Sequence, residues 1–377
     1  MSRTYTPGFK VLAHTTVRKI RQLPLKGKVH LTKGEMVLPD TVVASTYIPG
    51  NVQMVNVAQL LNLEPDSVSD SLLVKIDESI KKGQLIAENK GFFGLFKSNI
   101  KSPIDGTLAN VSDITGQVIL SEPPVPIEVD AYTSGEVVEI LPEEGLIVET
   151  DGAYIQGILG IGGENRGEIV VAVESPDQEI TPDLLKDEFR GKVVVGGSFL
   201  SLEAYRKAEE IGVAALVVGG FSYSDLSEIL GFPLGVAITG SEELVTTLII
   251  TEGFGRINMA QRTYNLLKQH QTHFAAVNGA TQIRAGVIRP EVLIPAEAGG
   301  GKATEVDEAN LAITSGSVVR IIRDPFFGRV GKVVGLPASL TKMASETMVR
   351  VAEIEFDDHK IEIIPRANLE IIVMDDE

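Results

Sequence analysis

The sequence predicts a multidomain, β-rich α+β protein. Its 377 residues exceed the roughly 100 to 200 residues of one ordinary domain. Short runs rich in Val, Ile and Thr recur along the chain and are separated by turn residues, among them 37 Gly, which is typical of many short strands. From residue 188 to 295 the pattern changes, because strand-like and helix-like segments alternate there.

The composition argues against several kinds of chemistry. The chain has no Cys, which removes disulfides, thiolate metal ligands and thiol nucleophiles. His270 and His273 have no third ligand in view, so we predict no metal site and no cofactor. No apolar run reaches the length of about 18 residues that a membrane-spanning helix needs, and the N-terminal region lacks the apolar core of a signal peptide. We expect a soluble, cytoplasmic protein.

The charge is distributed unevenly along the chain. The net charge is -17, yet residues 1–34 contain eight Lys and Arg and no acid, which leaves -25 for the rest. We predict a basic N-terminal arm over residues 1–26. Such an arm binds phosphate groups or an anionic membrane surface, or it folds back onto the acidic body.

Residues 27–125 contain repeated units of strand, turn, Gly and strand. The segments Lys82–Ala87 (KGQLIA) and Lys101–Thr107 (KSPIDGT) give the clearest pattern, with Gly83, Pro103 and Gly106 at the turns. This pattern resembles the barrel-sandwich fold of biotinyl and lipoyl carrier domains. The position that corresponds to the modified lysine is Leu95, so the resemblance implies neither biotin nor lipoate. Relatives without the lysine occur in one of the proteins of the Rnf electron-transport complex and in the large subunit of RNA polymerase, where the fold is structural.

A cluster of large apolar residues interrupts this region. In a hairpin tip such a cluster is a candidate docking loop for a protein, because contiguous exposed apolar surface marks interfaces. The alternative is that the loop covers its own sandwich. The residues are Phe92, Phe93, Leu95 and Phe96.

Residues 126–180 are predicted to form a second β unit. Its closely spaced glycines suggest a nucleotide loop, but a strand rather than a helix follows them, so tight turns are the better interpretation. These glycines are Gly157, Gly160, Gly162, Gly163 and Gly167.

Residues 188–295 are predicted to form an α/β domain. Leu202, Tyr205, Ala208 and Ile211 fall on one helical face. The opening, GKVVV followed by a helix, resembles the swivelling domains of the protease-associated type, which are non-catalytic. Gly and Ser residues at the predicted strand ends suggest a site for a nucleotide or a phosphorylated metabolite, or else they serve as turn and helix-cap residues. The candidates are Gly196, Gly197, Ser198, Gly220, Ser241 and Gly253.

The C-terminal region begins after a Gly- and acid-rich linker over residues 296–314. Residues 315–377 have the length and strand pattern of a small five-stranded barrel. Gly316–Gly331 (GSVVRIIRDPFFGRVG) resembles the KOW motif of NusG-type transcription factors and several ribosomal proteins. The resemblance implies an SH3-like barrel that contacts RNA or protein. The implied contact residues are Arg320, Arg323, Phe326, Phe327, Arg329 and Lys332.

The charge of this predicted barrel weakens the expectation that it binds RNA. Residues 317–350 carry +4 and residues 351–377 carry -7, whereas strong nucleic-acid binding needs a net basic face. A protein partner is therefore at least as well supported as RNA, and no sequence readout of DNA is predicted. The leading hypothesis is a non-enzymatic adaptor for a transcription- or ribosome-associated complex. The alternatives are an enzyme or sensor that binds a nucleotide or phosphometabolite, and a peripheral subunit of a membrane complex.

Overall fold

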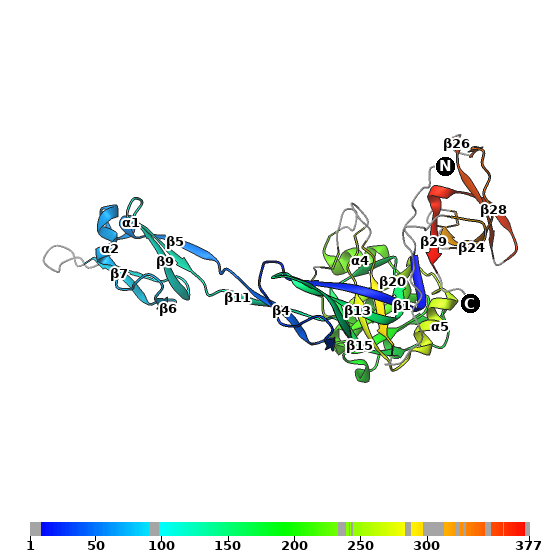
Figure 1. The fold of residues 1–377 in the computed structure, drawn as a ribbon, viewed down its shortest axis with the longest axis horizontal. Helices are drawn as coiled ribbons and strands as arrows, with labels where there is room; N and C mark the ends of the chain where they lie inside the picture. The colour runs from blue at the N-terminus through cyan, green and yellow to red at the C-terminus, as the bar shows by residue number, and fades with distance from the viewer. Residues whose placement is uncertain are drawn as a thin grey trace.

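The chain is an elongated, β-rich α+β protein of several modules, as predicted (Figure 1). A lobe lies at one end, a central body in the middle and a C-terminal module at the other end. The computed structural model describes residues 9–89, 98–232, 239–240, 242, 244–282, 288–296, 313–321, 325–326, 329–343, 348–356 and 358–373.

The central body has a parallel part. Strand β15 (Glu164–Val171) pairs with β17 (Val193–Val195), followed by β19 (Ala215–Phe221) and β20 (Thr247–Phe254), all in parallel. Strand β14 (Leu159–Ile161) is antiparallel to β20. The short strands β16 (Glu179–Ile180) and β18 (Phe199–Leu200) extend the sheet beside β19. The helices of this part are α3 (Leu202–Ile211), α4 (Tyr223–Leu230) and α5 (Gln261–Gln269).

Helix α3 shows how the local sequence sets these elements. The side chain of Ser201 caps the N-terminus by accepting a hydrogen bond from the amide of Ala204, and Gly212 ends the helix in the left-handed conformation. Tyr205, Ala208 and Ile211 are buried, which confirms that part of the predicted inner face.

An antiparallel part continues the same sheet. Strand β15 also pairs with β21, which leads through β22 and β13 to β1. Strand β12 pairs with β13 on the edge opposite β1, and it also pairs with the short β3. The bounds are β1 (Phe9–Gln22), β3 (Met36–Val37), β12 (Gly135–Leu141), β13 (Gly145–Gln156), β21 (Phe274–Asn278) and β22 (Glu291–Pro295).

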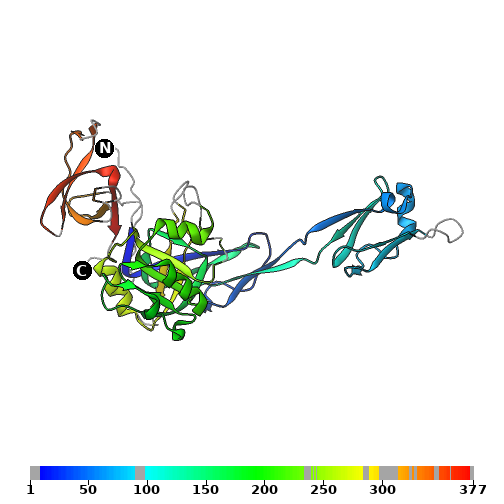
Figure 2. The ribbon, with the colours of Figure 1, turned by 180° about the vertical axis from the view of Figure 1, so that it is seen from behind.

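A narrow neck joins the body to the lobe (Figure 2). At its base, β2 (Lys28–Val29), β4 (Val42–Ile48) and β11 (Val125–Asp130) form a three-stranded antiparallel sheet. Beyond it, β5 (Val52–Asn56) and β10 (Gln117–Ser121) remain paired, so two strands run from the body into the lobe.

The lobe is completed by residues between those two strands. Its strands are β6 (Ser79–Ile80), β7 (Leu85–Asn89), β8 (Ser98–Lys101) and β9 (Gly106–Ser112), and its helices are α1 (Val57–Leu61), α2 (Val68–Ser71) and a 3₁₀ turn at Pro65–Ser67. It has its own hydrophobic core, which includes Leu61, Ile86, Leu108, Val118 and Leu120.

The C-terminal module is an antiparallel sheet in the order β29-β23-β24-β27-β28. The bounds are β23 (Val318–Ile321), β24 (Val330–Gly335), β25 (Thr341–Lys342), β26 (Met348–Val349), β27 (Val351–Phe356), β28 (Ile361–Pro365) and β29 (Leu369–Val373), with a 3₁₀ turn at Arg366–Asn368. The module meets the body where β29 pairs in parallel with the start of β1.

The modules do not follow the boundaries drawn from the sequence. Residues 9–22 of the predicted arm form a strand of the body. Residues 27–125 divide between the neck and the lobe, and residues 126–180 share the sheet and core of the α/β region. The physical reason is that these strands find partners more than 80 residues away, which a local pattern does not reveal. Most of the predicted linker lies outside the described residues.

Candidate functional site

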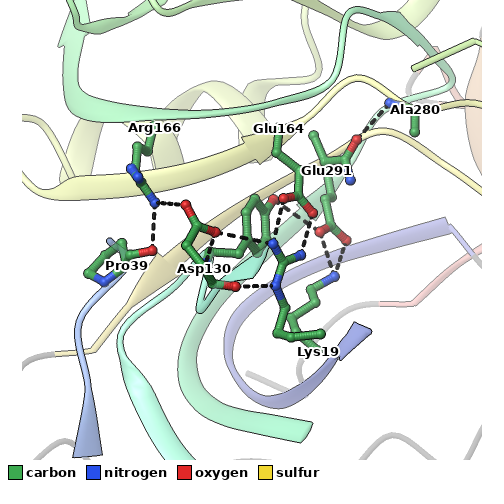
Figure 3. Close-up of polar contacts among 10 residues, drawn as sticks. Lys19, Pro39, Asp130, Glu164, Arg166, Ala280 and Glu291 are labelled. Atoms are coloured by element: carbon green, nitrogen blue, oxygen red, sulfur yellow. Dashed lines mark hydrogen bonds and ion pairs between the residues drawn. The ribbon is translucent and has the colours of Figure 1, made fainter. Parts of the chain in front are cut away.

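The described part of the chain has three candidate sites: a partly buried ionic network, the ends of the parallel strands, and a cavity where the C-terminal module meets the body. The network joins residues of β1, β15 and β22 in the body (Figure 3). The ammonium group of Lys19 approaches both carboxylate oxygens of Glu291 at 2.5 Å. The hydroxyl groups of Tyr132 and Tyr154 donate to the same carboxylate, at 3.1 and 2.7 Å. Glu291 is buried, and its charge is met by one cation and two hydroxyls.

The second half of the network is centred on Asp130. Arg21 donates to Asp130 and, through two nitrogens, to Glu164 at 2.6 and 2.8 Å. Arg166 donates to the other oxygen of Asp130 and to the carbonyl oxygen of Pro39. Both bonds of Arg166 are drawn in Figure 3, which also draws the hydrogen bond that the amide of Ala280 donates to the side-chain oxygen of Asn278. Loops from the neck and strands of the body are thereby joined through charged groups.

Burial and charge govern the titration of this network. Burial, reinforced by the carboxylates of Glu291 and Glu164, raises the pKa of Tyr132 well above its ordinary value, so its hydroxyl stays a donor. Burial alone would lower the pKa of Arg21, but the hydrogen bond and charge of Glu164 and the charge of Asp130 raise it overall. Three cations face three carboxylates, and each carboxylate is bonded. The arrangement suits a structural clamp rather than proton transfer.

The same network accounts for much of the basic N-terminal segment. Lys19 and Arg21 are paired inside the body. At the surface, Arg18 pairs with Glu149 and Lys26 pairs with Glu143. These four described cations support the alternative interpretation, in which the basic segment folds back onto the acidic body.

The ends of the parallel strands are filled by the chain's own backbone. The loop after β20 crosses these ends: the amide of Gly255 donates to the carbonyl oxygen of Phe221, and the amide of Ile257 donates to that of Ser198. A Cβ on Gly220 would overlap the carbonyl oxygen of Gly255, and one on Gly197 would overlap that of Gln178.

The remaining strand-end candidates are similarly occupied. A side chain on Gly196 would overlap Ile180. The Ser198 hydroxyl donates to the carbonyl oxygen of Asp177 at 2.6 Å. Gly253 is the register partner of Gly220 in the ladder between β20 and β19, and Ser241 lies outside the described residues. These contacts favour the interpretation that the glycines permit close backbone packing.

The predicted contact residues of the C-terminal module that the structure describes do not form one exposed patch. The prediction that Arg320 belongs to an exposed contact surface is corrected, because this residue is 1% exposed. Its guanidinium group donates to the carbonyl oxygen of Thr251 and to Glu252 and Glu370. Among the predicted contact residues that are described, only Lys332 is classed as exposed. Arg329 is half-exposed, pairs with Asp358, and lies 3.8 Å from the ring of Phe356.

Phe326, another predicted contact residue, packs against the core of the module. Arg323 and Phe327 lie outside the described residues, as do the docking-loop candidates Phe92, Phe93, Leu95 and Phe96.

A cavity of about 370 Å³ lies where the C-terminal module meets the body. Its walls come from Val11 on β1, from Glu252 and residues 258–263 of the body, and from β23, β24 and β29 of the module. Glu252 accepts hydrogen bonds from Arg320 and from the amide of Ala260, each at 3.0 Å. Sequence reasoning missed this site because its walls come from segments far apart in the chain, and because the KOW-like segment that supplies Val318, Arg320 and Val330 was interpreted as an exposed contact surface.

Two further features of the described residues bear on function. Across the part of the chain that the structure describes, no group of three or more His, Asp or Glu side chains is placed to hold a metal ion. Within the same part, no helix has both the length and the apolar character needed to cross a membrane.

Comparison with known proteins adds no assignment. No protein-family model matches the chain, and a search of curated proteins finds no match.

Proposed function

We propose that this protein is a non-enzymatic adaptor or assembly factor that docks onto a large transcription- or ribosome-associated complex through its C-terminal module. The observation that carries the proposal is the separation of the modules. The lobe and the C-terminal module lie at opposite ends of the molecule, each around a hydrophobic core that shares no residue with the core of the body (Figure 1). Such a layout suits a protein that holds two binding surfaces apart.

The C-terminal module is the proposed docking element because of its KOW-like sequence and its five strands. Among the predicted contact residues that the structure describes, the exposed basic group is Lys332, which lies opposite Glu355 on the neighbouring strand. Arg329 is tied to Asp358, so part of the basic turn is already neutralised. A mixed surface of this kind favours a protein partner, with phosphate contacts as a minor contribution.

The lobe is proposed to be a structural, barrel-sandwich-like module without a cofactor. Its sequence resembles carrier domains but has Leu95 at the lysine position. The paired strands of the neck present it away from the body. We assign it a spacing or second docking role.

Affinity purification of the intact chain from cells, with and without nuclease, tests the proposal. We expect the same stable set of ribosomal or transcription proteins to be recovered in both arms, because the contact is chiefly with protein. Recovery of no stable complex in either arm would contradict the adaptor function. Recovery that disappears with nuclease would instead assign the contact to RNA.

The two alternatives have less support from the described residues. The strand ends proposed to hold a nucleotide are occupied by the loop after β20. The cations that would attract a membrane surface include four that are paired with carboxylates of the body. A thermal-shift screen of nucleotides and sugar phosphates tests the first alternative, and flotation with anionic liposomes tests the second.

A further inference from the structure

The sheet of the C-terminal module has an open edge at β28. Within the described part of the chain, β28 pairs with β27 on one side, and no strand pairs with its other side. In Figure 1 it lies on the side of the module that faces away from the body. An edge strand presents unpaired amide and carbonyl groups, and another chain can pair with them. This edge is therefore a candidate surface for the addition of a strand.

The alternation of hydrogen bonds shows which backbone groups of β28 face the open edge. The amide of Phe356 donates to the carbonyl oxygen of Lys360, and the register between β27 and β28 is unbroken from there. In an antiparallel pair, every second residue exchanges hydrogen bonds with its opposite residue. Lys360 and every second residue after it therefore face β27, and the amide and carbonyl groups of Ile361 and Ile363 point outward. Pro365 also points outward but has no amide to donate.

The same two isoleucines expose their side chains. Ile361 is 57% exposed and Ile363 is 51% exposed. They lie opposite Glu355 and Glu353 of β27, on the outer face of the sheet. In strand addition, main-chain hydrogen bonds supply affinity and alternate side chains supply selectivity. The open edge of β28 offers both at the same residues.

The carboxylates at this edge select the charge of a partner. Glu362 lies opposite Ile354 and so shares a face with the core of the module. No described cation is paired with Glu362 or with Glu353, whereas the neighbouring Lys360 is already paired with Asp358. Residues 351–377 together carry -7. A basic partner is favoured by these charges.

The same charges disfavour a second copy of this chain as the occupant. If two β28 strands paired through Ile361 and Ile363, the carboxylate of Glu362 in one copy would lie directly opposite Glu362 in the other. Like charges directly opposite each other destabilise a strand pair. The net charge of -17 adds repulsion between whole molecules.

We propose that the open edge of β28 binds an extended, basic segment of a partner protein by strand addition. The segment alternates apolar side chains with Lys or Arg. Its apolar side chains lie beside Ile361 and Ile363 on the outer face, and its cations lie beside Glu362 on the other face. The alternation follows from the two-residue period of a strand.

This inference deepens the adaptor function and rests on it for the existence of a partner, because it names the docking edge and the chemistry of the segment that binds there. Lys332 lies two strands away from the edge, beyond Glu355, and is placed to contact another part of the partner.

Two labelled peptides of about eight residues, a common strand length, test the edge on the full-length protein. One alternates Val with Lys, and the other alternates Val with Glu. Fluorescence anisotropy should show the Lys peptide binding about tenfold or more tightly than the Glu peptide at low salt. Ile363→Pro removes an outward amide at a position where an edge strand tolerates proline, and it should weaken the Lys peptide by about tenfold. Ile363→Val is the matched control, because it keeps the amide and should stay within about twofold.

Charge and backbone protection are tested separately. Glu362→Gln should weaken the Lys peptide by about threefold, as for a partly exposed ion pair, whereas Glu136→Gln, at an exposed site on β12, should not. In nuclear magnetic resonance, saturation with the Lys peptide should slow amide exchange at Ile361 by about tenfold or more. Far-UV circular dichroism checks that each variant folds. Ile363→Lys, which places a cation on the apolar face, replaces Ile363→Pro if that variant does not fold.

Equal binding of the Lys peptide to the wild type and to the folded edge variant, or no binding to the wild type, would overturn the edge. Tighter binding of the Glu peptide would overturn the basic partner. A wild type that sediments as a dimer, with Ile363→Pro as a monomer, would assign the edge to a second copy instead.

Affinity purification with the same variants separates this inference from the adaptor function. Loss of the complex with Ile363→Pro but not with Ile363→Val would support the edge. Full recovery of the complex with Ile363→Pro would overturn the edge and leave the adaptor function standing. Recovery of no complex with the wild type would contradict the adaptor function, and the peptide measurements would then decide the edge alone.

Discussion

The guanidinium group of Arg320 donates to the carboxylate of Glu252 across the junction between the C-terminal module and the body, at 3.0 Å. Both side chains are almost completely buried. The same guanidinium donates to Glu370, which also accepts from Arg289 on the body. Burial and the neighbouring charge of Arg320 lower the pKa of Arg289, while Glu370 opposes that effect. A residue that the sequence assigns to a binding surface thus holds the module in place.

Removal of the Arg320 guanidinium should weaken this junction strongly. Arg320→Met leaves two carboxylates buried beside an apolar side chain, and loss of one partner of a buried pair costs about 3 to 5 kcal/mol. Amide hydrogen exchange should accelerate in β29 and at the start of β1. Arg329→Met is the control, since its pair with Asp358 is half-exposed and is worth about 1 kcal/mol or less. Equal effects of the two substitutions would contradict the assignment.

Substitution of Glu291 should destabilise the body. Glu291→Gln keeps the shape of the side chain but leaves the ammonium group of Lys19 without its carboxylate in a largely buried site. We expect a loss of about 3 kcal/mol or more in the free energy of unfolding of the body, measured by urea titration. Glu149→Gln removes the partner of Arg18 at the surface and should cost about 1 kcal/mol or less. A small effect of Glu291→Gln would mean that the network is not a clamp.

A side chain at Gly220 should be poorly tolerated. Gly220→Ala drives a methyl group into the carbonyl oxygen of Gly255 and should cost about 1 to 3 kcal/mol, as overpacking does. Gly163→Ala is the control, because the new methyl group would meet only the carbonyl oxygen of Gly240, at 3.4 Å. Thermal unfolding distinguishes the two. A stable Gly220→Ala protein that loses affinity for a nucleotide would instead support a ligand site at the strand ends.

The sequence predicted local elements well and long-range pairing poorly. Helix α3 follows from the predicted apolar face that includes Tyr205, Ala208 and Ile211, and the five-stranded sheet of the C-terminal module follows from the strand pattern of residues 315–377. The role of Arg320 could not be read, because Glu252 and Glu370 are 68 and 50 residues away in the chain. The cavity was missed for the same reason. The glycines at the strand ends resemble a ligand-binding loop in the sequence, and only the structure shows that the loop after β20 covers them.

The lobe should unfold independently of the body. Leu108 is 1% exposed within the lobe core, and Leu108→Ala should cost about 2 to 5 kcal/mol there. Differential scanning calorimetry should show one transition shifted to lower temperature and the others unchanged. A uniform shift of all transitions would mean that the lobe and body unfold as one cooperative unit.

His270 should make stability depend on pH. Burial, and next the charge of His273, lowers the pKa of His270 below its ordinary value. The neutral form therefore contributes stability that is present above about pH 6.5 and is lost as the pH falls through the lower, folded-state pKa. From about pH 7.5 to about pH 5.5, a range that includes the ordinary histidine pKa of about 6.5, the free energy of unfolding should fall more in the wild type than in His270→Gln. The control is His30→Gln, at an exposed site in the neck; if its pH profile flattened as much as that of His270→Gln, the assignment would be wrong.

Cross-linking mass spectrometry on the affinity-purified complex tests the adaptor function most directly. A lysine-reactive reagent reports which part of the chain lies against the captured proteins. We expect intermolecular cross-links to concentrate on Lys332, Lys342 and Lys360 of the C-terminal module, and Lys332→Glu to reduce recovery of the complex. Cross-links confined to Lys192 and Lys207 of the body, with recovery unaffected by Lys332→Glu, would contradict docking through the C-terminal module.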